Sequence, residues 1–297
     1  MYPKRKEKIV GIEEAISWIT KGSFVALGGF MIHNHPMAMV RELVRKKTGD
    51  LTIISTPPGG SIEADMLIGS GQATTIYSAY CGAEALGPVM PNYQRKIMNS
   101  EIKNYDFDEN TIVCGYRAAV AKLPCEITMG GLGSDMLKVN PFLKVFNDPI
   151  SNKPLVAVPP IQPDVALLHA QRADCYGNIQ HGGSVFMDEL IASAAKKVIV
   201  SVEEIIPHEF ITKDPFKTTI PSTLVDAIVR IPCGTHPFSS HAYYIQDEEH
   251  IKYYVKCAKD PKEYRAYLDK YVYSVKDNEE YLEKIGGVRK LFELKIY

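Results

Sequence analysis

The residues with the clearest chemical potential are two adjacent glycines, Gly28 and Gly29, which follow the apolar run "FVAL" at 24–27 and precede Phe30. Because glycine has no side chain, a ligand or another backbone segment can approach the main chain closely there. Successive N–H groups at such a turn can bind an anion or stabilise the oxyanion of a reacting carbonyl group. The two glycines alone are equally typical of a tight packing turn, so both interpretations stay open at this point.

Several better-known sites are excluded by the residues around this turn. A dinucleotide-binding fingerprint requires GxGxxG, whereas the chain reads GGFMIH from Gly28, and no GK[ST] of a phosphate-binding loop is present. His33 and His35 are separated by one residue, but no third ligand follows at a fitting spacing, so we expect no metal site. No Ser-His-Asp order or nucleophile elbow is present either.

The elements that must position the glycine turn alternate between strands and helices. A short helix precedes the strand at 24–27, and Pro36 is suited to open the next helix because its missing N–H is no loss in a first turn. Alternating elements of this kind predict an α/β fold with a mostly parallel sheet that is layered with helices on both faces. The expected elements in this part are a helix at 12–19, strands at 24–27, 51–55 and 73–80, and a helix at 37–47.

The middle of the chain is less regular. The β-branched stretch "TIVCGY" at 111–116 predicts a strand, followed by a helix at 117–123. The continuous apolar runs "LVAVPP" at 155–160 and "DVALLHA" at 164–170 predict central strands. A helix at 188–195 and a buried strand at 198–202 follow.

Length and composition indicate an ordinary globular protein. The chain has 297 residues, 45% hydrophobic and 23% charged, and we expect one domain over 1–297 with a Tyr-rich C-terminal extension from about 247. A net charge of -1 gives no basic surplus for nucleic acid, and no apolar run reaches the length of a membrane span. The six cysteines form no CxxC pair and the amino end lacks a leader pattern, so the expected location is cytoplasmic.

The segment "KGSFVALGGFMIHNHP" at 21–36 resembles the signature of class I CoA-transferases: Gly22, a strand of three apolar residues, Gly-Gly-Phe and a later proline. Lys21 and Asn34 depart from that pattern. Further stretches resemble the α subunit of glutaconate CoA-transferase and its relatives, so the resemblance runs from about residue 9 to the tail. These stretches are "DMLIGSGQ", "DVALLHAQRAD", "AAKKVIVSVEEII" and "VDAIVRIPCGTHP".

The resemblance implies chemistry that moves coenzyme A between carboxylates through a glutamyl-CoA thioester. In this family the attacking glutamate lies in a Glu-Asn-Gly-type or related segment of the β subunit; here Glu109-Asn110 is followed by Thr111. The resemblance therefore implies an α subunit that needs a β subunit, in a heterodimer or a dimer of heterodimers. Coenzyme A would be a co-substrate, with an acyl-CoA and a carboxylic acid as substrates and no permanently bound cofactor. Gly28, Gly29 and Phe30 would form the active-site loop and its oxyanion site.

The same resemblance indicates substrate-binding residues in two loops, Met31 and His33 after the first strand and Tyr80, Cys81 and Glu84 after the third. Glu84 is a substrate contact or a solvated loop residue, the second being favoured. Cys81 is better interpreted as a small buried residue than as a nucleophile.

Two predictions concern residues outside these loops. We expect His169 to be a hydrogen-bonded core or interface histidine rather than a catalytic base. The Tyr-rich tail could equally cover the core of this subunit or contact a partner, since interfaces favour tyrosine, and we expect a partner contact for part of it. The residues concerned are Tyr243, Tyr244, Tyr253, Tyr254, Tyr264, Tyr267, Tyr271 and Tyr273.

Other functions remain open at this stage. Relatives with the same two-subunit fold are CoA-ester ring hydrolases or acyl-CoA decarboxylases, and nothing in this half of such an enzyme excludes them. A non-catalytic binding subunit is a third possibility, which the glycine loop disfavours.

Overall fold

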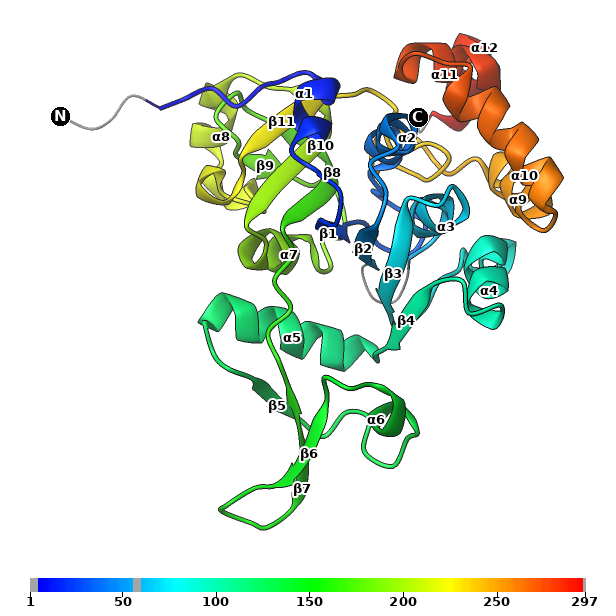
Figure 1. Ribbon diagram of the computed structural model, residues 1–297. Helices are drawn as coiled ribbons and strands as arrows, with labels where there is room; N and C mark the ends of the chain where they lie inside the picture. Colours follow the sequence, from blue (N-terminus) through cyan, green and yellow to red (C-terminus); the bar gives the residue numbers. More distant parts are fainter. Residues whose placement is uncertain (1–4, 56–59, 296–297) are drawn as a thin grey trace.

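A parallel sheet forms the centre of the protein in the computed structural model, which describes residues 5–55 and 60–295 (Figure 1). The strand order is β11-β10-β8-β1-β2-β3-β4, every neighbouring pair on this path is parallel, and the short β9 pairs antiparallel with β8. The prediction of an α/β fold with a mostly parallel sheet is confirmed. The strands are β1 (Phe24–Leu27), β2 (Leu51–Ser55), β3 (Ala73–Ser78), β4 (Lys103–Asp106), β8 (Val165–Ala173), β9 (Ile179–Gln180), β10 (Lys197–Ile205) and β11 (Ala227–Arg230).

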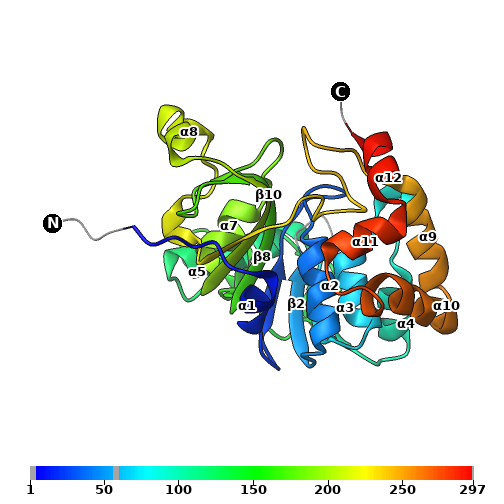
Figure 2. The same cartoon turned by 90° about the horizontal axis from the view of Figure 1, so that it is seen from above.

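Helices cover both faces of this sheet because successive side chains of a strand point to opposite sides. On β1, Val25 and Leu27 belong to one buried apolar cluster, whereas Ala26 belongs to the other. The first cluster includes side chains of α1 (Ile12–Ser17), α2 (Met37–Lys46) and α3 (Ile62–Gly69), and the second those of α5 (Glu109–Ala121) and α7 (Asp188–Ala194). Figure 2 shows the first group of helices to one side of the sheet. The remaining helices before the tail are α4 (Pro91–Met98), α6 (Met136–Val139) and α8 (His208–Lys213).

A smaller antiparallel sheet projects from the body below α5 (Figure 1). Its order is β5-β7-β6, with β5 at Glu126–Thr128, β6 at Lys144–Asn147 and β7 at Pro154–Val158. The predicted strand at 155–160 is present as β7 and is the middle strand of its sheet, but it lies in this small antiparallel sheet and not in the parallel one. Only Val156 and Val158 of this strand are buried, and an apolar run of this length does not distinguish a strand with one buried face from one with two.

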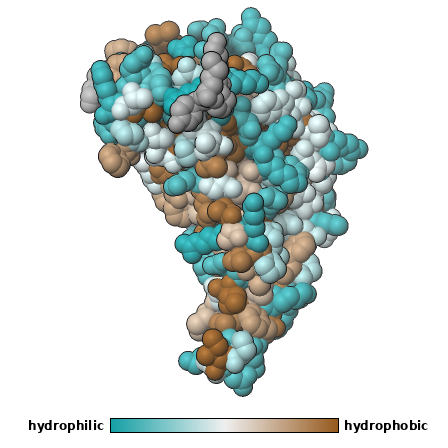
Figure 3. All heavy atoms as spheres, turned by 90° about the vertical axis from the view of Figure 1, so that its left-hand side faces the viewer, coloured by the Kyte–Doolittle hydropathy of each residue, from teal (hydrophilic) through white to brown (hydrophobic). Residues whose placement is uncertain are grey.

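The projecting sheet also exposes apolar side chains, including Ile127 and Met129. Figure 3 shows apolar residues gathered along this part of the molecule.

The strand predicted at 111–116 is wrong, because these residues lie inside α5. Asp108 caps this helix: its carboxylate accepts the Thr111 N–H at 2.6 Å, and the Thr111 hydroxyl accepts the Asp108 N–H at 3.0 Å. Ile112, Tyr116 and Ala119 then recur at helical spacing on the buried side. The reciprocal cap and this buried stripe outweigh the weak strand preference of the β-branched residues.

The C-terminal extension consists of α9 (Glu248–Ala258), α10 (Pro261–Leu268), α11 (Asn278–Ile285) and α12 (Gly287–Leu294), which lie beside α2, α3 and α4 (Figure 2). The Tyr254 hydroxyl donates to the buried Asp65 at 2.7 Å, and the Tyr264 hydroxyl donates to the Met66 carbonyl at 3.2 Å. Part of the Tyr-rich tail therefore covers the core of this subunit, which is one of its two interpretations. The tyrosines that this chain buries are Tyr244, Tyr254, Tyr264, Tyr267 and Tyr271.

Tyr253 is exposed, and for it the partner contact stays a prediction. The division of the chain into one domain with an extension stays a prediction as well. No helix within the described ranges is both long and apolar enough to cross a bilayer.

Arg41 of α2 holds the extension in place, and we predict a large loss of stability when it is removed. Its guanidinium is buried, lies 3.6 Å from the centre of the Tyr281 ring, and donates to the His236 carbonyl at 3.0 Å and to Asn278 Oδ1 at 2.8 Å. Arg41→Ala leaves two acceptors unpaired and opens a cavity, so it should lower the free energy of unfolding by about 3 kcal/mol. Urea unfolding measures this. Arg289→Ala, at an exposed surface pair, should change it by less than about 0.5 kcal/mol.

Burial lowers the pKa of His250 to about 3, and this predicts a pH dependence of stability. Between that value and 6.5 the unfolded chain binds a proton that the folded chain does not, so the free energy of unfolding should fall as the pH falls. The slope from this group is at most about 1.4 kcal/mol per pH unit. His250→Gln, an amide that still reaches the Tyr267 hydroxyl, should show a shallower slope in urea unfolding between pH 7 and 4. Equal slopes would contradict the assignment.

Candidate active site

The glycine loop at residues 28–30 lies at the carboxyl end of β1, between β8 and β2 in the middle of the sheet (Figure 1). Open parallel sheets bind ligands at the carboxyl ends of their strands. The loop is therefore in the part of the fold where a site is expected.

Each N–H group of this loop already has an acceptor in the chain. The Gly28 N–H donates to the Leu167 carbonyl at 2.9 Å, the Gly29 N–H to Asp188 Oδ1 at 3.0 Å, and the Phe30 N–H to the His33 carbonyl at 2.9 Å. The expectation that Gly28 and Gly29 present free donors to an oxyanion is wrong for this conformation of the chain. The role of the loop as part of an active site stays a prediction.

Packing alone requires glycine at both positions. A Cβ on Gly28 would lie 2.5 Å from Leu168 Cδ2 and 2.7 Å from Asp188 Oδ1. Gly29 has φ +106°, and a Cβ there would lie 2.9 Å from the His33 carbonyl oxygen. The two glycines thus allow β8, α7 and the following turn to close around the loop.

Two buried pairs of an acid and a histidine flank the loop. On one side, His181 Nε2 lies 3.4 Å from Asp188 Oδ2, and on the other, His35 Nδ1 lies 3.3 Å from Glu63 Oε2. His35 Nε2 also lies 2.9 Å from the Met31 carbonyl, so both ring nitrogens face acceptors. Burial opposes a charge on this ring, but Glu63 and the carbonyl outweigh it and raise the pKa of His35. The contacts of His35 with the Met31 carbonyl and with Glu63 therefore join the loop to α3.

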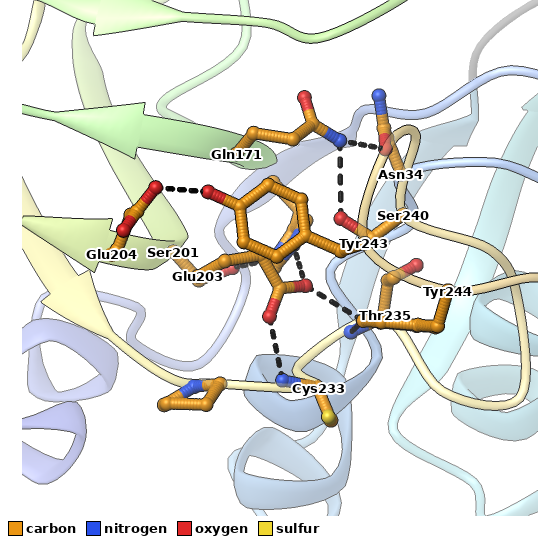
Figure 4. Close-up of polar contacts among 12 residues, drawn as sticks. Asn34, Gln171, Ser201, Glu203, Glu204, Cys233, Thr235, Ser240, Tyr243 and Tyr244 are labelled. Atoms are coloured by element: carbon orange, nitrogen blue, oxygen red, sulfur yellow. Dashed lines mark hydrogen bonds and ion pairs between the residues drawn. The ribbon is translucent and has the colours of Figure 1, made fainter. Parts of the chain in front are cut away.

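A polar network joins the loop to β8 and to the segment after β11 (Figure 4). The Gln171 side-chain amide donates to Asn34 Oδ1 at 2.8 Å and to Ser240 Oγ at 3.1 Å, and its oxygen accepts the Gly182 N–H at 2.7 Å. Within the described ranges, Asn34 Nδ2 is buried without a hydrogen-bond partner. Buried polar groups are normally paired, so this donor favours a further polar group binding here.

His33 lies in the same region. Its ring centre is 4.9 Å from that of His241, and its Nδ1 contacts Ser239 Oγ. Partial burial and the neighbouring His241 and His35 lower the pKa of His33, so it is neutral near pH 7. The ring of Phe30 packs on Phe186 at 4.6 Å between ring centres.

The loop after β3, which carries Tyr80, Cys81 and Glu84, lies at the same carboxyl end of the sheet as the glycine loop. Cys81 Sγ lies 3.9 Å from the Ser61 carbonyl, next to the Glu63 that pairs with His35. Burial raises the pKa of the Cys81 thiol well above its ordinary value, which makes it a poor nucleophile and agrees with its interpretation as a small buried residue. Tyr80 is half-buried, and Glu84 is exposed with φ +52°. Their contact with substrate stays a prediction.

His169 is a hydrogen-bonded core residue, as predicted. It is fully buried, with Nδ1 2.9 Å from Ser201 Oγ and Nε2 3.0 Å from Glu203 Oε1. Glu203 also accepts from the Tyr244 hydroxyl and the Cys233 N–H, both at 2.7 Å (Figure 4). Burial alone would raise the pKa of Glu203, but His169 and these donors lower it.

Sequence reasoning missed Asp188 and Glu63, although both carry the geometry of the loop. Asp188 opens a helix 159 positions from Gly29, and Glu63 reads as an ordinary first-turn acid of α3. The only available signal was that each acid begins a helix directly after a loop that follows a strand.

Within the described ranges, no cluster of three or more His, Cys, Asp or Glu side chains is arranged to hold a metal ion.

A family model described as coenzyme A transferase matches residues 9–230, which is more than half of the chain. The chain belongs to the coenzyme A transferase family. The A subunit of glutaconate CoA-transferase from Acidaminococcus fermentans is 32% identical, and the match covers 97% of this chain and 95% of that one. The crystal structure of that glutaconate CoA-transferase matches with a TM-score of 0.93 at 31% identity, over 98% of this chain and 96% of the other.

Two further proteins are similar to this chain. The crystal structure of the decarboxylase AibA/AibB matches with a TM-score of 0.79 at 29% identity, over 90% of this chain and 100% of that chain. An uncharacterized protein of Archaeoglobus fulgidus is 35% identical over 97% of this chain, but the chain spans only 64% of its length. The resemblance to CoA-transferase α subunits is confirmed by these matches.

We predict that the carboxylate of Asp188 stabilises the glycine loop through the Gly29 amide. Asp188→Ala leaves this buried N–H unpaired and should lower the free energy of unfolding by about 1–3 kcal/mol. Asp188→Asn retains an oxygen that can accept the bond and should cost less. Hydrogen exchange at the Gly29 amide, measured together with urea unfolding, should rank wild type, Asn and Ala in that order of protection. Equal protection in the two variants would contradict the role of the bond.

Proposed function

We propose that this chain is the α subunit of a heteromeric CoA-transferase that moves coenzyme A between a short acyl-CoA and a carboxylic acid. The observation that carries the proposal is the Gly-Gly-Phe loop, held between two buried acid–histidine pairs at the carboxyl end of the central strand. The match to the A subunit of glutaconate CoA-transferase along nearly the whole chain supports the same conclusion.

The reaction proceeds in two exchanges at a glutamate. Its carboxylate oxygen attacks the acyl-CoA carbonyl, the C–S bond breaks, and an acyl-glutamyl anhydride and free CoA thiolate result. The thiolate then attacks the glutamyl carbonyl, which releases the acid and leaves a glutamyl-CoA thioester. The acceptor carboxylate reverses both steps and leaves as the new acyl-CoA. Covalent catalysis of this kind divides one difficult transfer into easier ones.

The attacking glutamate comes from a β subunit in this proposal. Glu63 lies beside the loop, but its side chain is fully buried, pairs with His35 and accepts the Ser61 N–H at 2.7 Å. It is not free to reach a substrate. Met31, His33, Tyr80, Cys81 and Glu84 then form this subunit's side of the substrate site, in a cytoplasmic heterodimer or dimer of heterodimers.

Because Gly29 and its neighbours are already hydrogen-bonded within the chain, the loop contributes a shaped and rigid wall rather than free donors. Rigid walls exclude water and hold the reacting carbonyl in place. The donors for the oxyanion are then side chains of this chain, such as the Asn34 amide, or groups of the β subunit.

A decarboxylase is the second candidate, because the similarity to the AibA/AibB structure covers most of the chain. The two activities differ in what accumulates on the enzyme. A transferase given acyl-CoA alone stores CoA as a glutamyl thioester, whereas a decarboxylase releases carbon dioxide from an acyl-CoA that carries a second carboxylate.

The test uses the complex isolated with a tagged form of this chain from its own cells. Incubation with short acyl-CoAs, followed by borohydride reduction or hydroxylamine cleavage, should modify one glutamate, and mass spectrometry should place it on the partner. The purified chain alone should transfer no CoA. Modification of Glu84, or transfer by the chain alone, would contradict the proposal, and carbon dioxide release without a thioester would favour the decarboxylase.

A glycine substitution gives a matched control for the loop. Gly29→Ala forces a Cβ into the His33 carbonyl and should lower kcat/KM by at least about 100-fold, the usual scale when a positioning element shifts by about 1 Å. Gly11→Ala, where no atom lies within 4 Å of the added Cβ, should retain the activity of the wild-type complex. Equal activities of the two variants would remove the loop from the site.

A further inference from the structure

A cavity lies between α12 and the carboxyl ends of β10 and β11. Its volume is about 410 Å³. On one side it is lined by Pro232 and the ring of Tyr243, and on the other by Val288, Leu291 and Phe292 of α12. The three α12 residues are spaced i, i+3 and i+4, so they share one face of the helix. The exposed fractions of Val288 and Phe292 are 76% and 60%, so much of this apolar face is open to solvent.

This cavity is separate from the glycine loop. The cavity is lined from β10 and β11, which are the second and third strands from β1, and neighbouring strands lie about 4.8 Å apart. The two places are therefore roughly 10–14 Å apart along the sheet. The polar network of Figure 4 stands between them, with Glu203 and Tyr244 on the cavity side and Gln171 and Asn34 on the loop side.

The acids that line the cavity are paired within the chain. Glu203 accepts from His169, the Tyr244 hydroxyl and the Cys233 N–H. Glu204 pairs with Arg172 at 2.6 Å and also accepts from the Tyr243 hydroxyl (Figure 4).

Unlike the acids, the two bases that line the cavity have no ion-pair partner among the described residues. Arg230 and Lys295 both line it and are exposed, and among the described residues no carboxylate forms an ion pair with either. Arg230 acts on Glu204 only from beyond ion-pair distance, as one of several causes that lower the pKa of Glu204. An apolar cavity with paired acids and unpaired bases is complementary to a ligand with an apolar body and an anionic end.

The volume is compatible with a small amphiphilic ligand. Pockets for such ligands measure roughly 300–1,000 Å³, and the volume of about 410 Å³ lies within this range. A chain of about eight carbons can extend along the apolar face of α12 from a carboxylate at the bases.

We propose that this cavity is a binding site for a medium-chain carboxylate, whose chain packs on the α12 face and whose carboxylate binds Arg230 and Lys295. The source is a free carboxylic acid, because the acyl end of a simple CoA ester has no carboxylate. The inference does not rest on the proposed transferase function, because its residues belong to a different place in the fold.

Octanoate is the probe, and the full-length chain is titrated with it by calorimetry. Octanoate should bind at least about 10-fold more tightly than octan-1-ol, because a charge-assisted pair contributes on the order of 1.4 kcal/mol or more. The double variant Arg230→Ala/Lys295→Ala should lose this difference. Arg289→Ala removes a base on the same helix that pairs with Glu293, and it should bind octanoate as the wild type does.

Hydrogen exchange measured by mass spectrometry gives the location of the bound probe. Residues of α12 line the cavity, so saturating octanoate should slow amide exchange in α12 several-fold. No residue of α1 lines the cavity, and exchange in α1 should not change.

Equal binding of octanoate and octan-1-ol, unchanged binding by the double variant, or equal protection of the two helices would overturn the proposal.

Discussion

The backbone amide of Gly29 donates a hydrogen bond to the carboxylate of Asp188, and the geometry of the whole candidate site depends on this bond. It joins the end of the central strand to the first turn of a helix on the opposite half of the chain. A Cβ at Gly28 would collide with the same carboxylate, so the bond exists only because that residue is glycine. Removing one partner would leave a buried polar group unpaired, which costs more than the bond itself contributes.

Charges around the loop are paired in the same way. His35 lies 3.3 Å from Glu63 and His181 lies 3.4 Å from Asp188, so each buried acid has a histidine partner within ion-pair distance. Buried pairs of this kind carry a large desolvation cost and add little net stability, but they define one arrangement of the elements that they join. Polar contacts therefore fix how the loops pack at the carboxyl end of the sheet. The two apolar clusters supply the stability of the fold.

The C-terminal helices also stabilise the carboxyl end of the sheet, through contacts outside the loop itself. Arg41 binds the backbone of the segment after β11, and that segment carries Ser240 to the Gln171 network. Four tyrosines of the tail, Tyr254, Tyr264, Tyr267 and Tyr271, bury their rings in this chain, whereas Tyr253 is exposed. Apolar side chains are also exposed on the projecting part of the molecule (Figure 3).

From the sequence by itself one could determine the α/β class, the parallel core strands, the family and the position of the glycine loop, because these depend on local apolar runs and on a short motif. Only the tertiary structure decided that 111–116 is helical, that 155–160 lies in a separate antiparallel sheet, and that the loop amides are already bonded. The first depends on a cap at Asp108, and the others on contacts between residues far apart in the chain. A pattern within a short window records what a segment prefers, whereas the partner of a buried amide or charge is chosen by the packing of distant elements.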